Sequence, residues 1–361
     1  MGVSKHSFSK DGTIDEYELT NIAGIAISVT TWGARLTRFV VDDKNGKRRD
    51  IVAGFDSYES WQESLAIDDP YFGATVGRVG GRIWPCDSVQ IGNTTCTLPE
   101  NQPGKVCLHG GRVGFDKRIF SAQVISESQP ASIRFTYVSP DGEEGFPGEV
   151  ELHVTYSLHD DNSMHIDYSG RLNSGTETIF NPTNHTYWNL TGFEEPTILN
   201  HICRLAADKY MATRQDNVMV PTGELLPVSD NKALDFFSQP RRFGDDIHSF
   251  DKNTVRGYDH VFAVGDQPAD DIRFVAKVWS PQSGLALTVL SDQPALILYT
   301  GNWISPDLVG KHGIRYENYA AVALETQRFP NAVNIPRFRS QVLLHPDETF
   351  THHTVYRIGS I

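Results

Sequence analysis

This chain of 361 residues contains no long apolar run and no stretch that resembles a signal peptide. Residues 1–12 are polar and lack the apolar core that such peptides carry. Nowhere do apolar residues continue for the roughly 20 positions that a helix needs to cross a bilayer. We therefore expect a cytoplasmic protein with no membrane partner.

Cysteine is also scarce, and the four residues that occur form no C-x-x-C pair: Cys86, Cys96, Cys107 and Cys203. This spacing gives little support for a zinc site or a disulfide framework, so structural thiols are expected. The adjacent His352 and His353 are possible metal ligands, but they lie in a predicted terminal strand. Consecutive side chains of a strand point to opposite faces, so these two could hardly share one metal.

Positive charge is sparse as well. The chain has 32 Lys and Arg against 45 Asp and Glu, a formal net charge of -13, and its longest basic run is at residues 47–49. That run is expected to be a solvated turn. A strongly negative chain repels phosphate backbones and anionic lipid, so nucleic acid is a poor candidate for a partner.

Apolar residues make up 39% of the chain, and 30 Gly and 19 Pro are scattered through it, as in a globular protein with many turns. The length exceeds that of most single domains, but large all-β folds often run this long. We find no internal repeat, low-complexity tract or linker. We therefore predict one domain over residues 1–361.

The periodicity along the chain is that of strands. Apolar and polar residues alternate strictly over 150–158, the pattern of a strand with one buried face. The same period of two recurs at 25–29, 133–137, 164–168 and 285–289. Only short stretches such as Ser57 to Leu65 could form helical turns. The sequence therefore predicts an all-β fold, a large antiparallel β-sandwich with few short helices.

Two polar features suggest an acid and a base. The run Asn181 to Leu190 places His185 among amides, hydroxyls and aromatics, and a histidine can give or take a proton near neutral pH. Far downstream, Glu325 closes an apolar strand-like segment. If Ala321, Ala323 and Glu325 share one strand face, two small residues leave room for a ligand beside the carboxylate. A solvated strand end and a hydrogen-bonded core histidine are the structural alternatives.

Several motifs occur in one order from about Gly33 onwards. They are Gly77–Ile83, Leu108–Gly111, Asp141–Gly148, Thr183–Leu190, Pro221–Glu224, Gly257–His260, Gln293-Pro294, Tyr299–Asn302, Leu324–Gln327 and Phe329-Pro330. In this order they resemble the aldose 1-epimerase, or galactose mutarotase, family. The resemblance implies a galactose mutarotase-like supersandwich. It also implies interconversion of the α and β anomers of aldoses such as glucose and galactose, with no metal and no organic cofactor.

The resemblance also implies roles for individual residues. Opening a hemiacetal ring needs a base at the anomeric hydroxyl and an acid at the ring oxygen. In the family the position of Glu325 is the base and that of His185 the acid. By the same pattern, five residues contact sugar hydroxyls: Arg82, His109, Tyr187, Asp259 and Gln293. The structural alternatives are that Arg82 pairs with an acid, His109 stabilises a glycine turn and Asp259 caps a loop.

One position departs from the family pattern. The family has Asn before the arginine of its G-R-x-x-N-R-I segment, where this chain has Gly81. A missing side chain predicts a lost amide contact and extra space, and hence tolerance of larger reducing sugars such as maltose.

Two other functions stay open: a non-catalytic sugar-binding or sensor protein, and a hexose-6-phosphate 1-epimerase. The second would use the Arg241-Arg242 dipeptide. The expected partner is a small-molecule sugar, and the chain could be a monomer or a homodimer.

Overall fold

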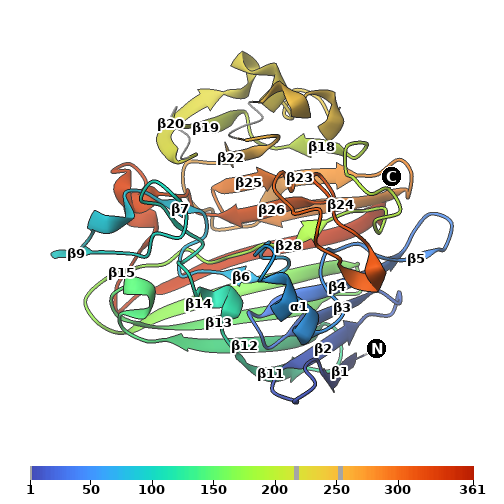
Figure 1. Cartoon of the computed structure of the whole chain (residues 1–361), viewed down its shortest axis with the longest axis horizontal. Helices are drawn as coiled ribbons and strands as arrows, with labels where there is room; N and C mark the ends of the chain where they lie inside the picture. The colour runs from blue at the N-terminus through green and yellow to red at the C-terminus, as the bar shows by residue number, and fades with distance from the viewer. Residues whose placement is uncertain (1, 215–218, 251–254) are drawn as a thin grey trace.

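The computed structural model describes residues 2–214, 219–250 and 255–361, which form antiparallel sheets (Figure 1). The largest sheet has nine strands, in the order β11 (Ser121–Ser126), β12 (Ala131–Ser139), β13 (Glu149–Leu158), β14 (Ser163–Ser174), β28 (Thr349–Ser360), β24 (Leu285–Ser291), β23 (Arg273–Trp279), β18 (Ile202–Leu205) and β21 (Arg241–Arg242). A six-stranded sheet has the order β17 (Tyr187–Trp188), β26 (Val322–Gln327), β25 (Ala295–Tyr299), β22 (Asp259–Ala263), β19 (Lys209–Thr213) and β20 (Pro221–Pro227).

The remaining strands form smaller sheets. Five strands pair in chain order: β1 (Gly2–Ser7), β2 (Asp15–Thr20), β3 (Ala26–Thr30), β4 (Arg35–Asp42) and β5 (Arg48–Asp50). Four two-stranded sheets pair β6 (Thr75–Val76) with β16 (Thr183–Asn184), β7 (Arg82–Ile83) with β10 (Cys107–Leu108), β8 (Val89–Ile91) with β9 (Thr94–Cys96), and β15 (Thr178–Ile179) with β27 (Leu343–Leu344).

Helix in the described ranges is limited to one short α-helix and single 3₁₀ turns. Helix α1 (Tyr58–Ser64) begins where the sequence predicts, because the Ser57 hydroxyl accepts a hydrogen bond from the Ser60 N–H at 3.2 Å. The 3₁₀ turns lie at Cys86–Ser88, Phe115–Lys117, Glu143–Gly145, Val228–Asp230, Lys232–Leu234, Phe243–Asp245, Ile247–Ser249, Lys311–Gly313, Ala332–Asn334 and Arg339–Gln341. The predicted all-β sandwich is confirmed.

The main core is formed by the nine-stranded sheet together with the five-stranded and six-stranded sheets. Alternate residues of β13 and β14, among them Tyr156 and Ile166, are fully buried and pack in one cluster with Leu298 and Leu324 of the six-stranded sheet. The Tyr356 hydroxyl of β28 donates a hydrogen bond to the Leu324 carbonyl at 3.0 Å and so joins the two layers. The six-stranded sheet therefore has one face in the core and one face turned away from it.

The terminal strand β28 confirms the prediction for the histidine pair. His352 is buried and stacks on Tyr168, whereas His353 pairs with Asp167 on the opposite face of the sheet. The two imidazoles therefore cannot share a metal. The four cysteines are buried and free, as structural thiols are expected to be.

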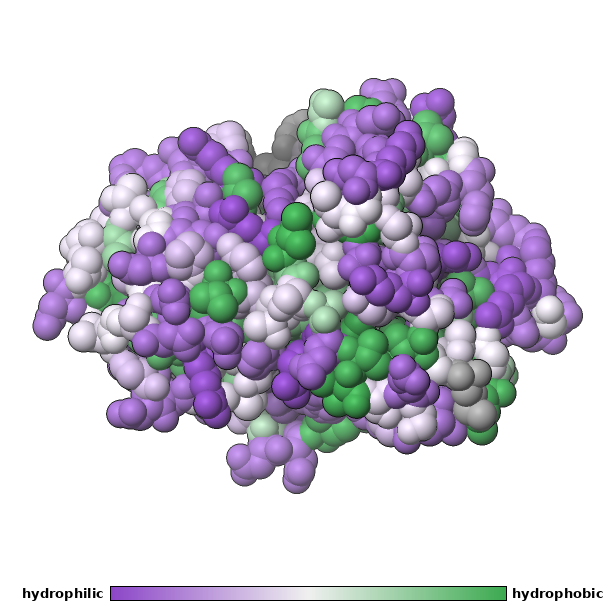
Figure 2. All heavy atoms as spheres, turned by 90° about the horizontal axis from the view of Figure 1, so that it is seen from below, coloured by the Kyte–Doolittle hydropathy of each residue, from purple (hydrophilic) through white to green (hydrophobic). Residues whose placement is uncertain are grey.

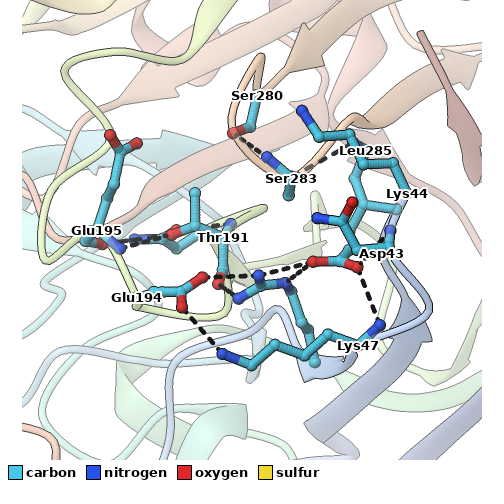
Figure 3. A network of polar contacts seen from close by, with 12 residues as sticks. Asp43, Lys44, Lys47, Thr191, Glu194, Glu195, Ser280, Ser283 and Leu285 are labelled. Atoms are coloured by element: carbon cyan, nitrogen blue, oxygen red, sulfur yellow. Dashed lines mark hydrogen bonds and ion pairs between the residues drawn. The ribbon is translucent and has the colours of Figure 1, made fainter.

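The basic run at residues 47–49 is only partly the solvated turn that the sequence predicts, because Lys47 and Arg48 are exposed but Arg49 is buried. Arg49 is 8% exposed; its Nε donates to Asp43 Oδ2 at 2.7 Å and its Nη1 to the Thr191 carbonyl at 2.6 Å. Its Nη2 also lies 2.6 Å from Glu194 Oε2. This polar network, shown in Figure 3, ties the β4–β5 turn to the loop that follows β17. It therefore anchors the chain just beyond Tyr187.

The face of the molecule shown in Figure 2 is largely hydrophilic. On the face shown in Figure 2, apolar side chains gather in a few limited groups between polar ones. Within the described ranges, no helix is long and apolar enough to cross a membrane.

Candidate active site

A cavity of about 450 Å³ opens on the face of the six-stranded sheet that points away from the main core. Six of the seven residues predicted for the site line it: Arg82, His109, His185, Tyr187, Asp259 and Glu325. They come from β7, β17, β22 and β26 and from the loops around them. The fold thus brings together residues that are up to 243 positions apart in sequence, counted from residue 82 to residue 325.

Strand alternation aims Glu325 into this cavity. Val322 and Leu324 belong to the main core, whereas Ala323 packs in a separate cluster with Tyr187, its cross-strand partner. Glu325 shares the face of Ala323 and is 2% exposed. The prediction that small residues share the face of the carboxylate is confirmed.

His185 is held beside Glu325 by its backbone. Its N–H donates to the Ala74 carbonyl at 2.8 Å, and its carbonyl accepts from the Gly73 N–H at 2.9 Å. Its ring stacks on Tyr187, with centroids 4.9 Å apart and an interplanar angle of 24°. These contacts place His185 Nε2 3.4 Å from Glu325 Oε1.

Burial shifts both members of this pair towards their uncharged forms. It raises the pKa of Glu325 well above its ordinary value, and the nearby charge of Asp259 adds to the shift. It lowers the pKa of His185 to about 4. Glu325 Oε2 and His185 Nδ1 are buried without a hydrogen-bond partner among the described residues, which is costly for a purely structural pair. The arrangement offers a proton donor and a proton acceptor to a ligand in the cavity.

His109 presents a fixed hydrogen-bond donor. The Gly81 N–H donates to His109 Nδ1 at 3.1 Å, so the proton of a neutral imidazole must be on Nε2. Burial, followed by the charges of neighbouring groups, lowers the pKa of His109 well below its ordinary value and keeps the ring neutral. The predicted alternative, support of a glycine turn, is therefore real but leaves Nε2–H available to a ligand.

Arg82 and Asp259 form an ion pair in the cavity wall. Both terminal nitrogens of Arg82 lie 3.3 Å from Asp259 Oδ2, and Arg82 Nε donates to Gln102 Oε1 at 3.0 Å. The two side chains are 21% and 16% exposed. Arg82 therefore pairs with an acid and is still accessible to a ligand.

Gln293 lies outside the cavity, so the structure does not support its predicted contact with a sugar. It is fully buried; its Oε1 accepts from Arg328 at 2.8 Å and its Nε2 donates to Asp292 at 2.6 Å. Gln293 precedes β25, and the cavity wall is formed by β25 itself through Ile297 and Tyr299. Ile297 is the cross-strand partner of Glu325.

The predicted extra space beside Gly81 is absent. Gly81 has a φ of +74°, and a Cβ at this position would lie 2.9 Å from the Cβ of Pro330. Pro330 therefore fills the volume that the missing side chain leaves. Gly81 contributes instead through its N–H, which orients His109.

Sequence reasoning missed several cavity residues: Asp68, Tyr71, Tyr299 and Trp303. Tyr71 contacts the ring of His109 edge-on at a centroid distance of 4.8 Å. Tyr299 lies within a family motif, which was a usable signal. The others lie in loops, where no periodicity marks a side chain as part of a site.

The donor atoms of His109, His185 and Glu325 lie within 4.8 Å of one another, close enough to hold a metal ion. The hydrogen bond that His109 accepts argues against metal binding. Nδ1 of His109 already accepts from Gly81, and its Nε2 carries the proton, so neither nitrogen has a lone pair free for a metal. The arrangement fits proton transfer better than metal binding.

The Arg241-Arg242 dipeptide is remote from the cavity. It forms the edge strand β21 of the nine-stranded sheet, where Arg241 pairs with Asp246 and donates to the Lys232 carbonyl. Neither arginine lines the cavity. The geometry gives no support for a sugar-phosphate site at this dipeptide.

The comparisons with known proteins agree with the site. The model of the family described as aldose 1-epimerase matches residues 15–357. The chain is 36% identical over 351 residues to galactose mutarotase of Mus musculus, an alignment that covers 97% of this chain and 96% of that protein. It is 31% identical over 340 residues to aldose 1-epimerase of Escherichia coli K12, with coverage of 94% and 93%.

Solved structures give the same result. An aldose epimerase homologue from C. elegans matches with a TM-score of 0.83 at 27% identity, over 95% of this chain and 98% of that one. Galactose 1-epimerase from Lactobacillus acidophilus matches with a TM-score of 0.81 at 27% identity, over 99% and 98%. The chain belongs to the aldose 1-epimerase family and is an isomerase of that class.

Proposed function

We propose that the protein interconverts the α and β anomers of uncharged aldoses such as glucose and galactose, with Glu325 as base and His185 as acid. The observation that carries this proposal is the buried pair itself, with Glu325 Oε1 3.4 Å from His185 Nε2 at the wall of a sugar-sized cavity. Each partner also has a polar atom without a hydrogen bond to the described residues. The substrate is a small molecule, and the chemistry needs no cofactor.

Ring opening requires two proton transfers. Glu325 takes the proton of the anomeric hydroxyl while His185 protonates the ring oxygen, and the C1–O5 bond breaks to give the open aldehyde. Rotation about the C1–C2 bond exposes the other face of the carbonyl. Closure with the two roles reversed yields the other anomer and restores the pair.

The two pKa shifts together leave one transferable proton on the pair of Glu325 and His185. Burial favours protonated Glu325 and neutral His185 in the empty site. Moving that proton from Glu325 to His185 produces a carboxylate base and an imidazolium acid without any exchange with solvent. Hydrogen bonds from the sugar to Glu325 and His185 offset part of the cost of this charge separation.

Other cavity groups orient the sugar. His109 Nε2–H is a fixed donor, and the Arg82–Asp259 pair presents a donor and an acceptor to vicinal hydroxyls. Tyr187 positions His185 by stacking and lines the cavity. These contacts hold the anomeric carbon against the acid and the base.

Burying the acid and the base with unpaired polar atoms costs stability, and a protein that only binds sugar gains nothing from that cost. Catalysis is therefore favoured over a sensor role. Polarimetry on freshly dissolved α-glucose and α-galactose tests the proposal. We expect the native protein to accelerate the approach to equilibrium rotation. His185→Asn keeps a polar side chain but cannot supply the proton near pH 7, so it should lose most of the rate while circular dichroism shows an intact fold. Sugar binding by the native protein without acceleration would establish the sensor alternative.

A further inference from the structure

The cavity wall carries more negative than positive charge. Three aspartates line it, Asp68, Asp69 and Asp259, whereas Arg82 is the single Lys or Arg among the described lining residues. Arg82 is paired with Asp259 at 3.3 Å, and Asp69 is paired with Lys117 at 2.5 Å. In the described part of the chain, no ion pair balances Asp68.

The Asp68 carboxylate is held in place at the wall. Its Oδ2 accepts a hydrogen bond from the Ser305 N–H at 3.2 Å, which joins the segment before β6 to the loop after β25. Its charge acts on Tyr299, another residue of the cavity wall. The pKa of Tyr299 is raised first by burial and then by the negative charges of Asp259 and Asp68.

A sugar in this cavity would lie within that field. Its anomeric carbon and ring oxygen must lie against Glu325 and His185, so its other substituents extend along the rest of the cavity wall, which includes Asp68. Like charges several Å apart repel more strongly in a partly closed cavity than in water. We estimate a discrimination of roughly 3- to 10-fold for one unit of charge.

We infer that Asp68 makes the cavity charge-selective, so that it accepts aldoses with neutral or cationic substituents and discriminates against those that carry a carboxylate or a phosphate. The inference rests on the proposed function. Asp68 is a specificity-determining residue here and takes no part in proton transfer.

A series of sugars that differ at C6 provides the test. Glucose, 6-amino-6-deoxyglucose, glucuronate and glucose 6-phosphate share one ring and differ in charge. Anomer exchange measured by NMR gives kcat/KM for each. In the native protein we expect kcat/KM to be highest for the amino sugar and glucose, lower for glucuronate and lowest for the phosphate.

Asp68→Asn should reduce the differences in kcat/KM among these four sugars. The asparagine oxygen can still accept from Ser305, so the loop contact survives the loss of charge. We expect the ratio of glucuronate to glucose to rise by about 3- to 10-fold, and the ratio of the amino sugar to glucose to fall by a similar factor. Added salt should weaken discrimination in the native protein more than in the variant.

Asp56→Asn is the matched control, because Asp56 is 53% exposed, lies outside the cavity and carries the same charge. Its ratios should equal those of the native protein. Equal shifts in both variants would assign the effect to net charge, and unchanged ratios in Asp68→Asn would also overturn the inference. If Asp68→Asn melts early, Asp68→Ser replaces it. Failure of the native protein to convert glucose would instead reject the proposed function.

Discussion

The two faces of the six-stranded sheet are built from the same strands but serve opposite purposes. Leu298 and Leu324 point to the inner face, where they are buried in the main core. Tyr299 and Glu325, their neighbours in sequence, point to the outer face and line the cavity. Because side chains of a strand alternate between its two faces, one strand supplies both core residues and cavity residues. Substitutions on the two faces should therefore have separable effects.

Glu325→Gln should have the largest effect on the outer face. The amide keeps the shape of the side chain but cannot accept the anomeric proton, so turnover should fall by about 10²–10⁴-fold. The melting temperature should hold or rise, because the cost of burying an acid is removed. Polarimetry and a thermal melt on the same sample measure both quantities. Native-like turnover would place the base on another residue.

Leu324→Ala is the corresponding change on the inner face. Leu324 is 1% exposed, and truncation of a buried leucine costs about 2–5 kcal/mol of unfolding free energy. Urea unfolding measures that loss, and the folded fraction should keep its turnover. Val138→Ala, at an exposed position of β12, should cost less than about 0.5 kcal/mol. A loss of turnover in Leu324→Ala beyond its unfolded fraction would show that the two faces are coupled.

The pH dependence of turnover also separates the two faces, because His185 and Glu325 both belong to the outer face. Burial lowers the pKa of His185 to about 4 and raises that of Glu325, so the pair holds one proton over the interval between them. As pH falls through the lower value, a second proton binds and removes the base. As pH rises through the upper value, the proton leaves and removes the acid. We expect kcat/KM to be highest in the interval between the two values and to fall on both sides of it, and both inflections report the titration of the pair as a unit. A single inflection near pH 6.5 would mean that His185 titrates as an exposed histidine.

The core strands of the nine-stranded sheet could be predicted from sequence far better than the outer face of the six-stranded sheet. Alternating apolar residues mark β13 and β14, and the order of the motifs indicated Glu325 and His185. Contacts between distant segments produce no periodicity or motif in the sequence. Pro330 fills the space beside Gly81 across 249 positions, counted from residue 81 to residue 330, and Arg49 finds its acids in a remote loop. Asp68 enters the site from a loop, where its neighbours in sequence resemble any solvated turn.

Gly81→Ala should have the smallest effect and tests the packing at the rim of the outer face. A positive φ costs an alanine about 1–2 kcal/mol, and contact with Pro330 should add to that cost. Gly46→Ala is the control, because Gly46 has a φ of +75° and a Cβ added there would meet no atom within 4 Å. A greater loss of unfolding free energy in Gly81→Ala than in Gly46→Ala isolates the contact.

The same variant tests whether Gly81 sets substrate size. Since Pro330 occupies the volume beside it, the ratio of kcat/KM for maltose to that for glucose should stay the same, although both values fall as the bond to His109 is disturbed. Replacing Pro330 with Ala in the Gly81→Ala background should recover part of the loss. A ratio that shifts towards glucose in Gly81→Ala would show that open space beside residue 81 does admit larger sugars.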